Sequence, residues 1–274
     1  MSEINTAAAI RRKNADWQFP DFKEKQFTKK ASKYAVCVFV INEGKKIQQQ
    51  IKKMEKYSSV ADIIIADGGS SDGSLEDNYL RAHKVRALLV KTGPGKLSAQ
   101  MRMAFAWALD QGYEGVVVVD GNDKDDVSAI PHFIDKLREG YDHIQGSRFI
   151  KGGRAVNTPL ERLLAVRLIH SPLISLAARY RYTDTTNGFR AYSRRLLTDP
   201  GLNIFRDIFS TYELHYYLAI EAARAKKYKI IEIPVARAYP KKGKTPTKIS
   251  PIKGNLNILI VLIRAIFRTN LPDK

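Results

Sequence analysis

The sequence contains little that would build a covalent framework or a membrane span. Cys37 is the single cysteine among 274 residues, so a disulfide framework and a cysteine-based metal site are excluded. The apolar segment 256–267 is interrupted by Arg264 and is shorter than the roughly 20 apolar residues that cross a bilayer. No apolar segment of secretory length stands near Met1, so we expect a cytoplasmic protein.

Positive charge is abundant but unevenly placed. The formal net charge is +18. Residues 1–145 carry 22 Lys and Arg against 20 Asp and Glu, whereas residues 146–274 carry 24 against 8. A basic half favours an anionic substrate, an anionic membrane surface, or both. Nucleic acid is the rival partner, but it is disfavoured because stacking motifs, helix-turn-helix patterns and zinc-finger signatures are absent.

Apolar runs alternate with helical patterns through the first 120 residues. We predict strands at residues 34–41, 61–66, 86–90 and 116–119, and helices at residues 47–57, 74–83 and 97–110. This alternation predicts an α/β fold with a doubly wound, mostly parallel sheet flanked by helices. Three strands end at polar loops, which therefore share the rim of the sheet where ligands bind.

The second half of the chain predicts further elements of the same domain. Helices are expected at 130–139, 160–180 (with a break or kink at Pro172) and 211–225, strands at 143–145 and 229–235, and a polar turn at 184–190. A basic loop, residues 237–253, leads to an apolar or amphipathic helix at 256–267. We expect three parts: an N-terminal arm at 1–33, at best partly ordered; an α/β domain at 34–235; and a C-terminal extension at 236–274.

The run of four valines at 116–119 ends abruptly at Asp120-Gly121-Asn122-Asp123. Oxygen ligands at a strand end suit a hard cation such as Mg²⁺ or Mn²⁺, which is the usual partner of a diphosphate. The alternative is a polar turn that caps the helix beginning at Ile130.

Four stretches, taken in order, carry a resemblance to a known family. They are Asn42-Glu43 after a strand; Asp67-Gly68-Gly69-Ser70-Ser71-Asp72-Gly73-Ser74; Asp120-Gly121-Asn122; and Gly146-Ser147-Arg148 followed by Asn187-Gly188-Phe189-Arg190. In this order the chain resembles family 2 glycosyltransferases of the GT-A fold over roughly residues 34–250. The resemblance is to the polyprenyl-phosphate sugar synthase branch in particular. It implies a Rossmann-like GT-A sheet with a nucleotide-binding half at 34–125 and an acceptor half at 126–235.

The resemblance implies a site for a nucleotide-sugar donor, linked to UDP or GDP. Asp67 is similar in position to the carboxylate that accepts a hydrogen bond from the base, although an Asx-turn residue is the alternative. Lys96 precedes a helix N-terminus, which suits a phosphate or base contact. The full set of donor-binding candidates is Asn42, Glu43, Asp67, Gly69, Lys96, Asp120, Gly121 and Asn122.

The resemblance also implies a metal site. Asp120 and Asn122 occupy the family's Asp-X-Asp position, which holds the Mg²⁺ or Mn²⁺ that bridges the diphosphate. An asparagine can ligate through its amide oxygen but brings no charge. Either the metal affinity is weaker, or Asp123 supplies the missing charge.

The acceptor side is expected to be cationic. Arg148, and then Arg154, Arg162 and Arg190, would bind anionic groups of the acceptor, although a solvated basic face is the alternative. A lipid phosphate already carries a nucleophilic oxygen. A hydroxyl acceptor needs a general base, for which Asp184 is preferred over Glu213 because Asp184 lies on a turn.

These expectations describe a metal-dependent, inverting glycosyltransferase that moves a sugar to a polyprenyl phosphate. The catalytic candidates are Asp120, Arg148, Asp184 and Arg190. A glycan hydroxyl is the alternative acceptor. From another class, a catalytically inactive RNA- or membrane-binding protein on a transferase scaffold stays open because of Asn122. The basic C-terminal part could lie on the inner face of a membrane, pack on the core, or contact a second copy.

Overall fold

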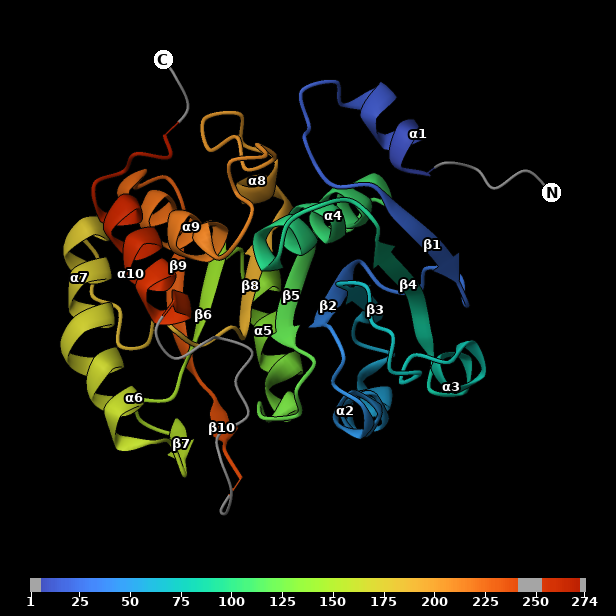
Figure 1. The fold of residues 1–274 in the computed structure, drawn as a ribbon, viewed down its shortest axis with the longest axis horizontal. Helices are drawn as coiled ribbons and strands as arrows, with labels where there is room; N and C mark the ends of the chain where they lie inside the picture. Colours follow the sequence, from blue (N-terminus) through green and yellow to red (C-terminus); the bar gives the residue numbers. More distant parts are fainter. Residues whose placement is uncertain (1–5, 241–252, 272–274) are drawn as a thin grey trace.

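The computed structural model describes residues 6–240 and 253–271, with a single eight-stranded sheet at the centre of these residues (Figure 1). Its strand order is β1-β4-β3-β2-β5-β8-β6-β9. The strands are β1 (Phe22–Gln26), β2 (Tyr34–Val40), β3 (Asp62–Asp67), β4 (Val85–Lys91), β5 (Gly115–Asp120), β6 (His143–Ser147), β8 (Arg190–Ser193) and β9 (Ile230–Pro234). A separate pair joins β7 (Arg154–Val156) to β10 (Ala236–Ala238) in parallel.

Parallel pairing dominates the sheet, as predicted. Strands β4, β3, β2 and β5 are successive parallel neighbours, and β6 and β9 form a second parallel pair. The antiparallel members are β1 at one edge and β8, which lies between β5 and β6. Every residue of β2 and β3 is buried, because these runs of Val and Ile have helices on both faces.

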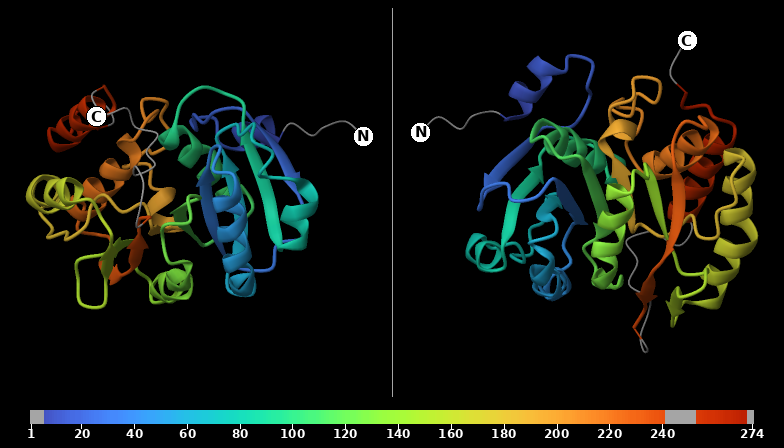
Figure 2. Two further views of the ribbon diagram at one scale, coloured as in Figure 1. Left: turned by 60° about the horizontal axis from the view of Figure 1, so that its bottom comes forward. Right: turned by 180° about the vertical axis from the view of Figure 1, so that it is seen from behind.

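The helices form two layers around the sheet (Figures 1 and 2). One face packs against α1 (Thr6–Lys13), α4 (Leu97–Asp110) and α9 (Glu213–Arg224). The other packs against α2 (Lys45–Met54), α3 (Asp77–Ala82) and α5 (Ile130–Arg138). A short helix, α8 (Arg194–Leu197), follows β8.

A third cluster of apolar side chains joins α9 to the last helices. The predicted helix at 160–180 consists of α6 (Leu160–Leu164), a π-helical segment (Ala165–His170) and α7 (Ser171–Ala178). Pro172 lies in the first turn of α7, where its missing N–H is tolerated, so it does not break the helix. The predicted C-terminal helix is α10 (Lys253–Ile266), which packs on α7 and α9. Residues 241–252 of the predicted basic loop lie outside the described residues.

One sequence-based expectation is wrong, and one strand was missed. Residues 6–33 are not a partly ordered arm, because β1 pairs with β4 and α1 buries Ala7 and Ile10 in the core. Trp17 also stacks on Phe205, with ring centroids 4.0 Å apart. The turn predicted at 184–190 runs directly into β8, an antiparallel strand that was not predicted.

Candidate active site

The polar ends of three adjacent strands meet at one rim of the sheet, as expected for parallel strands. Asp67 at the end of β3 pairs in register with Val40 of β2, and Asp120 at the end of β5 pairs with Phe39. The backbone N–H of Gly121 donates to the Phe39 carbonyl at 2.8 Å. The fold therefore brings the Asn42, Asp67 and Asp120 loops together.

The loop after β3 is held by its own side chains. Asp67 is buried, and its carboxylate accepts hydrogen bonds from the backbone N–H of Ser70 at 2.9 Å and from its hydroxyl at 2.5 Å. Asn42 joins this network, because its Oδ1 accepts from the backbone N–H of Ser71 at 2.8 Å. Gly69 has φ of +97°, a conformation that few other residues adopt. Asp67 thus makes the predicted Asx turn, and its role towards a base stays a prediction.

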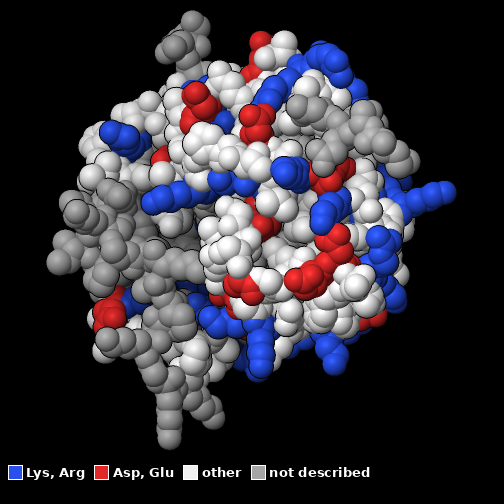
Figure 3. All heavy atoms as spheres, turned by 45° about the vertical axis from the view of Figure 1, so that its right-hand side comes forward, with Lys and Arg blue, Asp and Glu red and all other residues white. Residues whose placement is uncertain are grey.

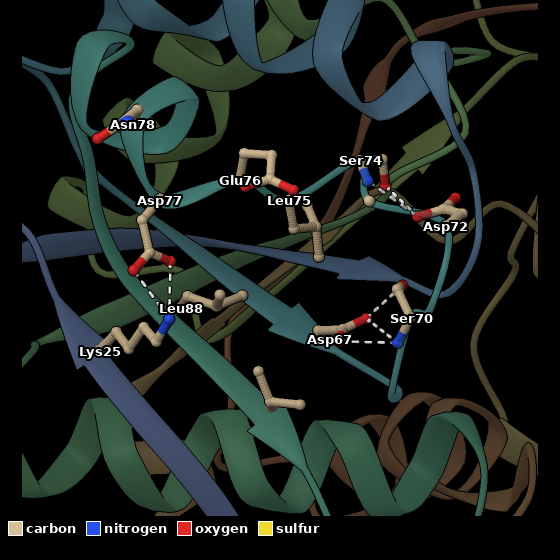
Figure 4. A pocket seen from close by; sticks show the side chains of 12 residues that line it. Lys25, Asp67, Ser70, Asp72, Ser74, Leu75, Glu76, Asp77, Asn78 and Leu88 are labelled. Atoms are coloured by element: carbon tan, nitrogen blue, oxygen red, sulfur yellow. Dashed lines mark hydrogen bonds and ion pairs between the residues drawn. The ribbon is translucent and has the colours of Figure 1, made fainter.

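A polar cavity of about 420 Å³ opens beside this loop (Figure 4). Asp67 and Ser70 lie at one end, and the ion pair of Lys25 with Asp77 lies at the other, with Nζ 2.8 Å from Oδ2. Lys25 comes from β1, which the sequence did not place near the rim. Lys96 occupies the N-cap position of α4, and its backbone N–H donates to the Ser210 carbonyl at 2.7 Å. Glu43 forms an ion pair with Lys46 at 3.4 Å.

Gln100 of α4 is a rim residue that sequence reasoning missed. Its Nε2 donates to the carbonyls of Val40 at 3.1 Å and Ala66 at 3.0 Å, and so it bridges the ends of β2 and β3. A glutamine inside an amphipathic helix gives no signal of such a contact.

Asp120 is the partly exposed carboxylate at the end of β5, with 30% of its side chain accessible. A Cβ at Gly188 would lie 3.1 Å from its Oδ1. The lack of a side chain at Gly188 therefore lets the turn before β8 approach Asp120 closely. Asn122 lies beside it, with Nδ2 3.5 Å from Asp120 Oδ2. Gly121 has Val40 Cβ only 2.9 Å from the position of a Cβ, so only glycine fits there.

Asp123 points to Lys53 of α2 in this structure. Both of its carboxylate oxygens contact Lys53 Nζ of α2, at 2.7 and 2.8 Å, so its charge is already offset. Within residues 6–240 and 253–271, no group of three or more Asp, Glu, His or Cys side chains could hold a metal ion. That Asp123 replaces the charge missing at Asn122 stays a prediction, which the pairing with Lys53 disfavours.

Arg237 of β10 is the cation closest to Asp120 in the described contacts, and it was not predicted. Its Nη2 lies 3.1 Å from Asp120 Oδ2, and its Nη1 donates to the buried carboxylate of Asp125. Burial acts to lower the pKa of Arg237, but Asp125 and Asp120 outweigh this and raise it. The sequence separation of more than 100 residues leaves no local pattern from which this contact could be predicted.

Arg148 and Asp184 form a fully buried ion pair. Arg148 Nε lies 2.6 Å from Asp184 Oδ2, and Nη2 lies 2.9 Å from Oδ1. The exposed fractions of the two side chains are 2% and 0%. Although burial acts to lower the pKa of Arg148, Asp184 raises it. Because both oxygens of Asp184 contact Arg148, this arrangement favours a structural role for Asp184, and its role as a general base stays a prediction.

Arg190 also serves the framework. Its three guanidinium nitrogens donate to the carbonyls of Asn187, His215 and Thr185 at 2.9, 2.8 and 2.7 Å. These contacts use three of its five N–H donors, and its predicted contact with an acceptor stays a prediction. Its positive charge nevertheless lies at the wall of the main cavity.

The main cavity has a volume of about 630 Å³ and reaches Asp120. Its lining comes from α6, the π-helical segment, the turn before β8, α9 and β10; polar members include Asp120, Arg148, Glu161, Arg162, His170, Arg190, Tyr212, His215, Arg237 and Tyr239. Arg162 donates to the Tyr239 hydroxyl at 3.1 Å. The other predicted candidates lie apart: Arg154 is exposed on β7, and Glu213 accepts hydrogen bonds from Thr211.

Comparison with known proteins decides the family. A family model described as "Glycosyl transferase family 2" matches residues 35–199, which is more than half of the chain. The chain belongs to glycosyl transferase family 2. The match includes the loops at Asn42, Asp67 and Asp120 and the arginine at 148, so the family resemblance inferred from these motifs is confirmed.

Curated relatives of this family 2 chain are named as glycosyltransferases. Glycosyltransferase AglJ of Haloferax volcanii is 28% identical over 87% of the chain and 74% of its own length. Undecaprenyl-phosphate mannosyltransferase of Micrococcus luteus is 24% identical over 71% and 79%. Polyprenol monophosphomannose synthase of Mycolicibacterium smegmatis is 27% identical over 59% of the chain and 62% of its own length, less than two thirds.

Solved structures of low sequence identity share the fold. Glucosyl-3-phosphoglycerate synthase from Mycobacterium tuberculosis, in complex with Mn²⁺, UDP and phosphoglyceric acid, has a TM-score of 0.59 at 19% identity. This likeness covers 88% of the chain and 80% of that structure. The predicted GT-A fold is confirmed. No helix in the described ranges is both long and apolar enough to cross a membrane.

The donor set at Asp120 fits a divalent cation. Asp120, with 30% of its side chain accessible, stands at the end of β5. Asn122 Oδ1 accepts from the backbone N–H of Lys124 at 3.3 Å and would join Asp120 as a ligand once the amide turns toward the ion. Mg²⁺ and Mn²⁺ accept such hard ligands and take their other oxygens from water and phosphates. When bound, such a cation would neutralise the charge that develops on a leaving diphosphate.

Proposed function

We propose that this family 2 enzyme transfers a sugar from a UDP- or GDP-linked donor to the phosphate of a polyprenyl phosphate, with inversion at the anomeric carbon. Asp120 and Asn122 hold the Mg²⁺ or Mn²⁺, and the loops at Asn42, Glu43, Asp67, Gly69, Lys96 and Gly121 hold the nucleotide. The names of the polyprenyl-phosphate relatives and the Mn²⁺ and UDP in the glucosyltransferase structure support this proposal.

The observation that carries the proposal is that two arginines in the cavity next to Asp120, Arg162 and Arg190, have no carboxylate among their described partners. Arg148 is offset by Asp184, and Arg237 is offset by Asp125 and Asp120. The described partners of Arg162 and Arg190 are instead neutral, namely a tyrosine hydroxyl and three carbonyls. A cavity with two such cations favours an anionic acceptor.

The pKa of Tyr239 reflects the positive potential of arginines in the same cavity. Burial acts to raise the pKa of this phenol, but Arg237 and Arg162 outweigh burial and lower it. A phosphate entering the cavity would meet this positive potential before it reached the donor at Asp120. Its charge would be stabilised there without removal of a proton.

The carboxylates of the cavity favour a phosphate over a hydroxyl acceptor. A hydroxyl requires a general base within hydrogen-bond reach. Asp184 is sealed by Arg148, and the carboxylates that line the described cavity are Asp120 and the exposed Glu161. Since Asp120 is committed to the metal, a phosphate oxygen that is already a nucleophile fits better.

A transfer assay separates the two acceptors. The enzyme is incubated with Mn²⁺, a panel of UDP- and GDP-sugars, and either a prenyl phosphate or the matching prenyl alcohol. We expect glycosylated product only from the phosphate, and a higher KM for the phosphate in Arg162→Gln. Transfer to the alcohol or to a glycan, but not to the phosphate, would overturn the proposal.

A further inference from the structure

A row of exposed apolar side chains runs along the outer face of α6, the π-helical segment and α7. We call it the leucine stripe: Leu160, Leu164, Leu168, Pro172 and Leu176, which follow one another at intervals of four residues. The leucines at 160, 168 and 176 are 68%, 68% and 75% exposed. Large exposed apolar patches of this kind mark interaction sites.

The helices that carry the leucine stripe also form the wall of the main cavity. Arg162, Val166 and His170 line the cavity, whereas the stripe residues do not. In Figures 1 and 2 these helices form one end of the molecule, with α10 beside them. The surface bound by the stripe would therefore lie next to the main cavity.

The charge around the stripe indicates the occupant. Residues 160–181 contain four arginines and one acidic residue, Glu161. Arg167, Arg179 and Arg181 are exposed. We infer that the leucine stripe is a membrane-docking face, on which leucines enter the interface of an anionic bilayer and arginines contact lipid headgroups. This inference rests on the proposed function for its purpose, which is delivery of a lipid-linked acceptor.

An amphipathic helix with leucines on one face and arginines at its flanks is the kind that lies in the headgroup region. A second copy of the chain fits less well. A two-fold interface would place the same arginine-rich surface against itself, and like charges would oppose one another. The stripe is about 24 Å long at 1.5 Å per residue.

The proposed membrane contact lies on the leucine stripe and not, as the sequence suggested, mainly on the C-terminal helix. The helix at 256–267 was a candidate for the interface, but α10 buries Val261, Leu262 and Ala265 against α7 and α9. Ile260 and Ile263 of α10, and Phe267 just after it, stay exposed at 41%, 44% and 75%.

Vesicle flotation with the full chain tests the inference. The probes are vesicles of phosphatidylcholine mixed with phosphatidylglycerol and vesicles of phosphatidylcholine alone. We expect wild type to bind the anionic vesicles, with binding that falls as salt rises. The triple variant Leu164→Ser, Leu168→Ser, Leu176→Ser should bind at least about tenfold more weakly. The matched control, Ile208→Ser, removes an exposed apolar side chain outside the stripe and should bind like wild type.

Two further arms keep the test decisive. If the triple variant does not fold, Arg167→Gln with Arg179→Gln is expected to weaken anionic binding while phosphatidylcholine binding is unchanged. Wild-type binding by the triple variant, equal loss in Ile208→Ser, or absence of wild-type binding would each overturn the inference. So would a stripe-dependent dimer that does not bind vesicles.

A separate assay tests the proposed function. A short, water-soluble prenyl phosphate needs no bilayer, so the triple variant should glycosylate it as fast as wild type and lose transfer only to a vesicle-embedded acceptor. If wild type glycosylates neither acceptor, the proposed function fails, whereas vesicle binding still reports on the stripe.

Discussion

A substitution in the buried Arg148–Asp184 pair can distinguish a structural role of Asp184 from a chemical one. We predict that Asp184→Asn mainly destabilises the fold. Asparagine preserves the shape of the side chain but leaves the Arg148 guanidinium buried without its counter-charge. Both oxygens of Asp184 contact Arg148, at 2.6 and 2.9 Å, and neither side chain is appreciably exposed.

Removing one partner of such a pair costs about 3–5 kcal/mol. For a chain of this size, that corresponds to a fall in the melting temperature of about 6–10 °C. Urea unfolding measures the free energy, and transfer is measured well below the melting temperature. The matched double variant, Arg148→Met with Asp184→Leu, should recover much of the stability, because no charge is left unpaired. If Asp184→Asn is as stable as wild type but does not transfer sugar, our assignment of Asp184 as a structural partner is refuted.

Two further predictions follow from individual contacts. Burial and the nearby Arg190 lower the pKa of His143 to about 3, so the unfolded chain binds a proton near pH 6.5 that the folded chain does not. The contribution of His143 is present above pH 6.5 and is lost as pH falls; acidification from pH 7 to 5 should cost about 2 kcal/mol through this residue. His143→Gln should reduce that dependence in urea titrations, and an unchanged dependence would contradict the assignment. Asp123→Asn removes a carboxylate that is paired with the exposed Lys53 and should cost less than about 1 kcal/mol. Its Mn²⁺-dependent nucleotide affinity should match that of wild type in calorimetry, and a large loss would restore Asp123 as a metal ligand.

The central strands could be predicted because their continuous apolar sequence indicates burial on both faces. The valines at 116–119 and the isoleucines at 63–65 form runs that only a strand covered on both faces would tolerate, and they became β5 and β3. The helix predicted at 97–110 is α4 with the same bounds. The rim of polar loops followed from these strands.

The edge and antiparallel strands could not be read in this way. Strand β1 has the sequence Phe-Lys-Glu-Lys-Gln, with one partner and one residue buried. Charged residues of that kind suit an edge strand, but without the neighbouring strand they look like a polar arm. Strand β8 is four residues long and follows a polar turn, so neither length nor alternation marked it.

The site was predictable as a set of loops but not as a set of contacts. Asp120 and Arg148 were singled out, but the partner of Arg148 is 36 residues away and could only be fixed by the packing of β6 and β8. Asp184 and Arg190 were given chemical roles because both were polar residues on one turn. Their burial, which assigns them to the framework, is a property of the folded chain.

The balance of charge differs between the two halves of the molecule, as the sequence indicated. Figure 3 shows acidic and basic side chains interspersed on the face that carries β1 and its neighbours. The cavity of the acceptor half is instead lined by four arginines and two carboxylates. Two of these arginines, Arg148 and Arg237, are paired with Asp184 and Asp125, so Arg162 and Arg190 are the ones that suit the anionic acceptor proposed above.

The central claim is that Asp120 anchors the metal through which the donor diphosphate is held. The measurement is calorimetric titration of UDP and GDP, with and without Mn²⁺, into wild type, Asp120→Asn and the matched control Asp135→Asn, an exposed carboxylate on α5. We predict that one nucleotide binds wild type and the control only with Mn²⁺, and that Asp120→Asn binds it at least about tenfold more weakly. Equal Mn²⁺-dependent affinity in Asp120→Asn, or binding by wild type that does not depend on metal, would contradict the account.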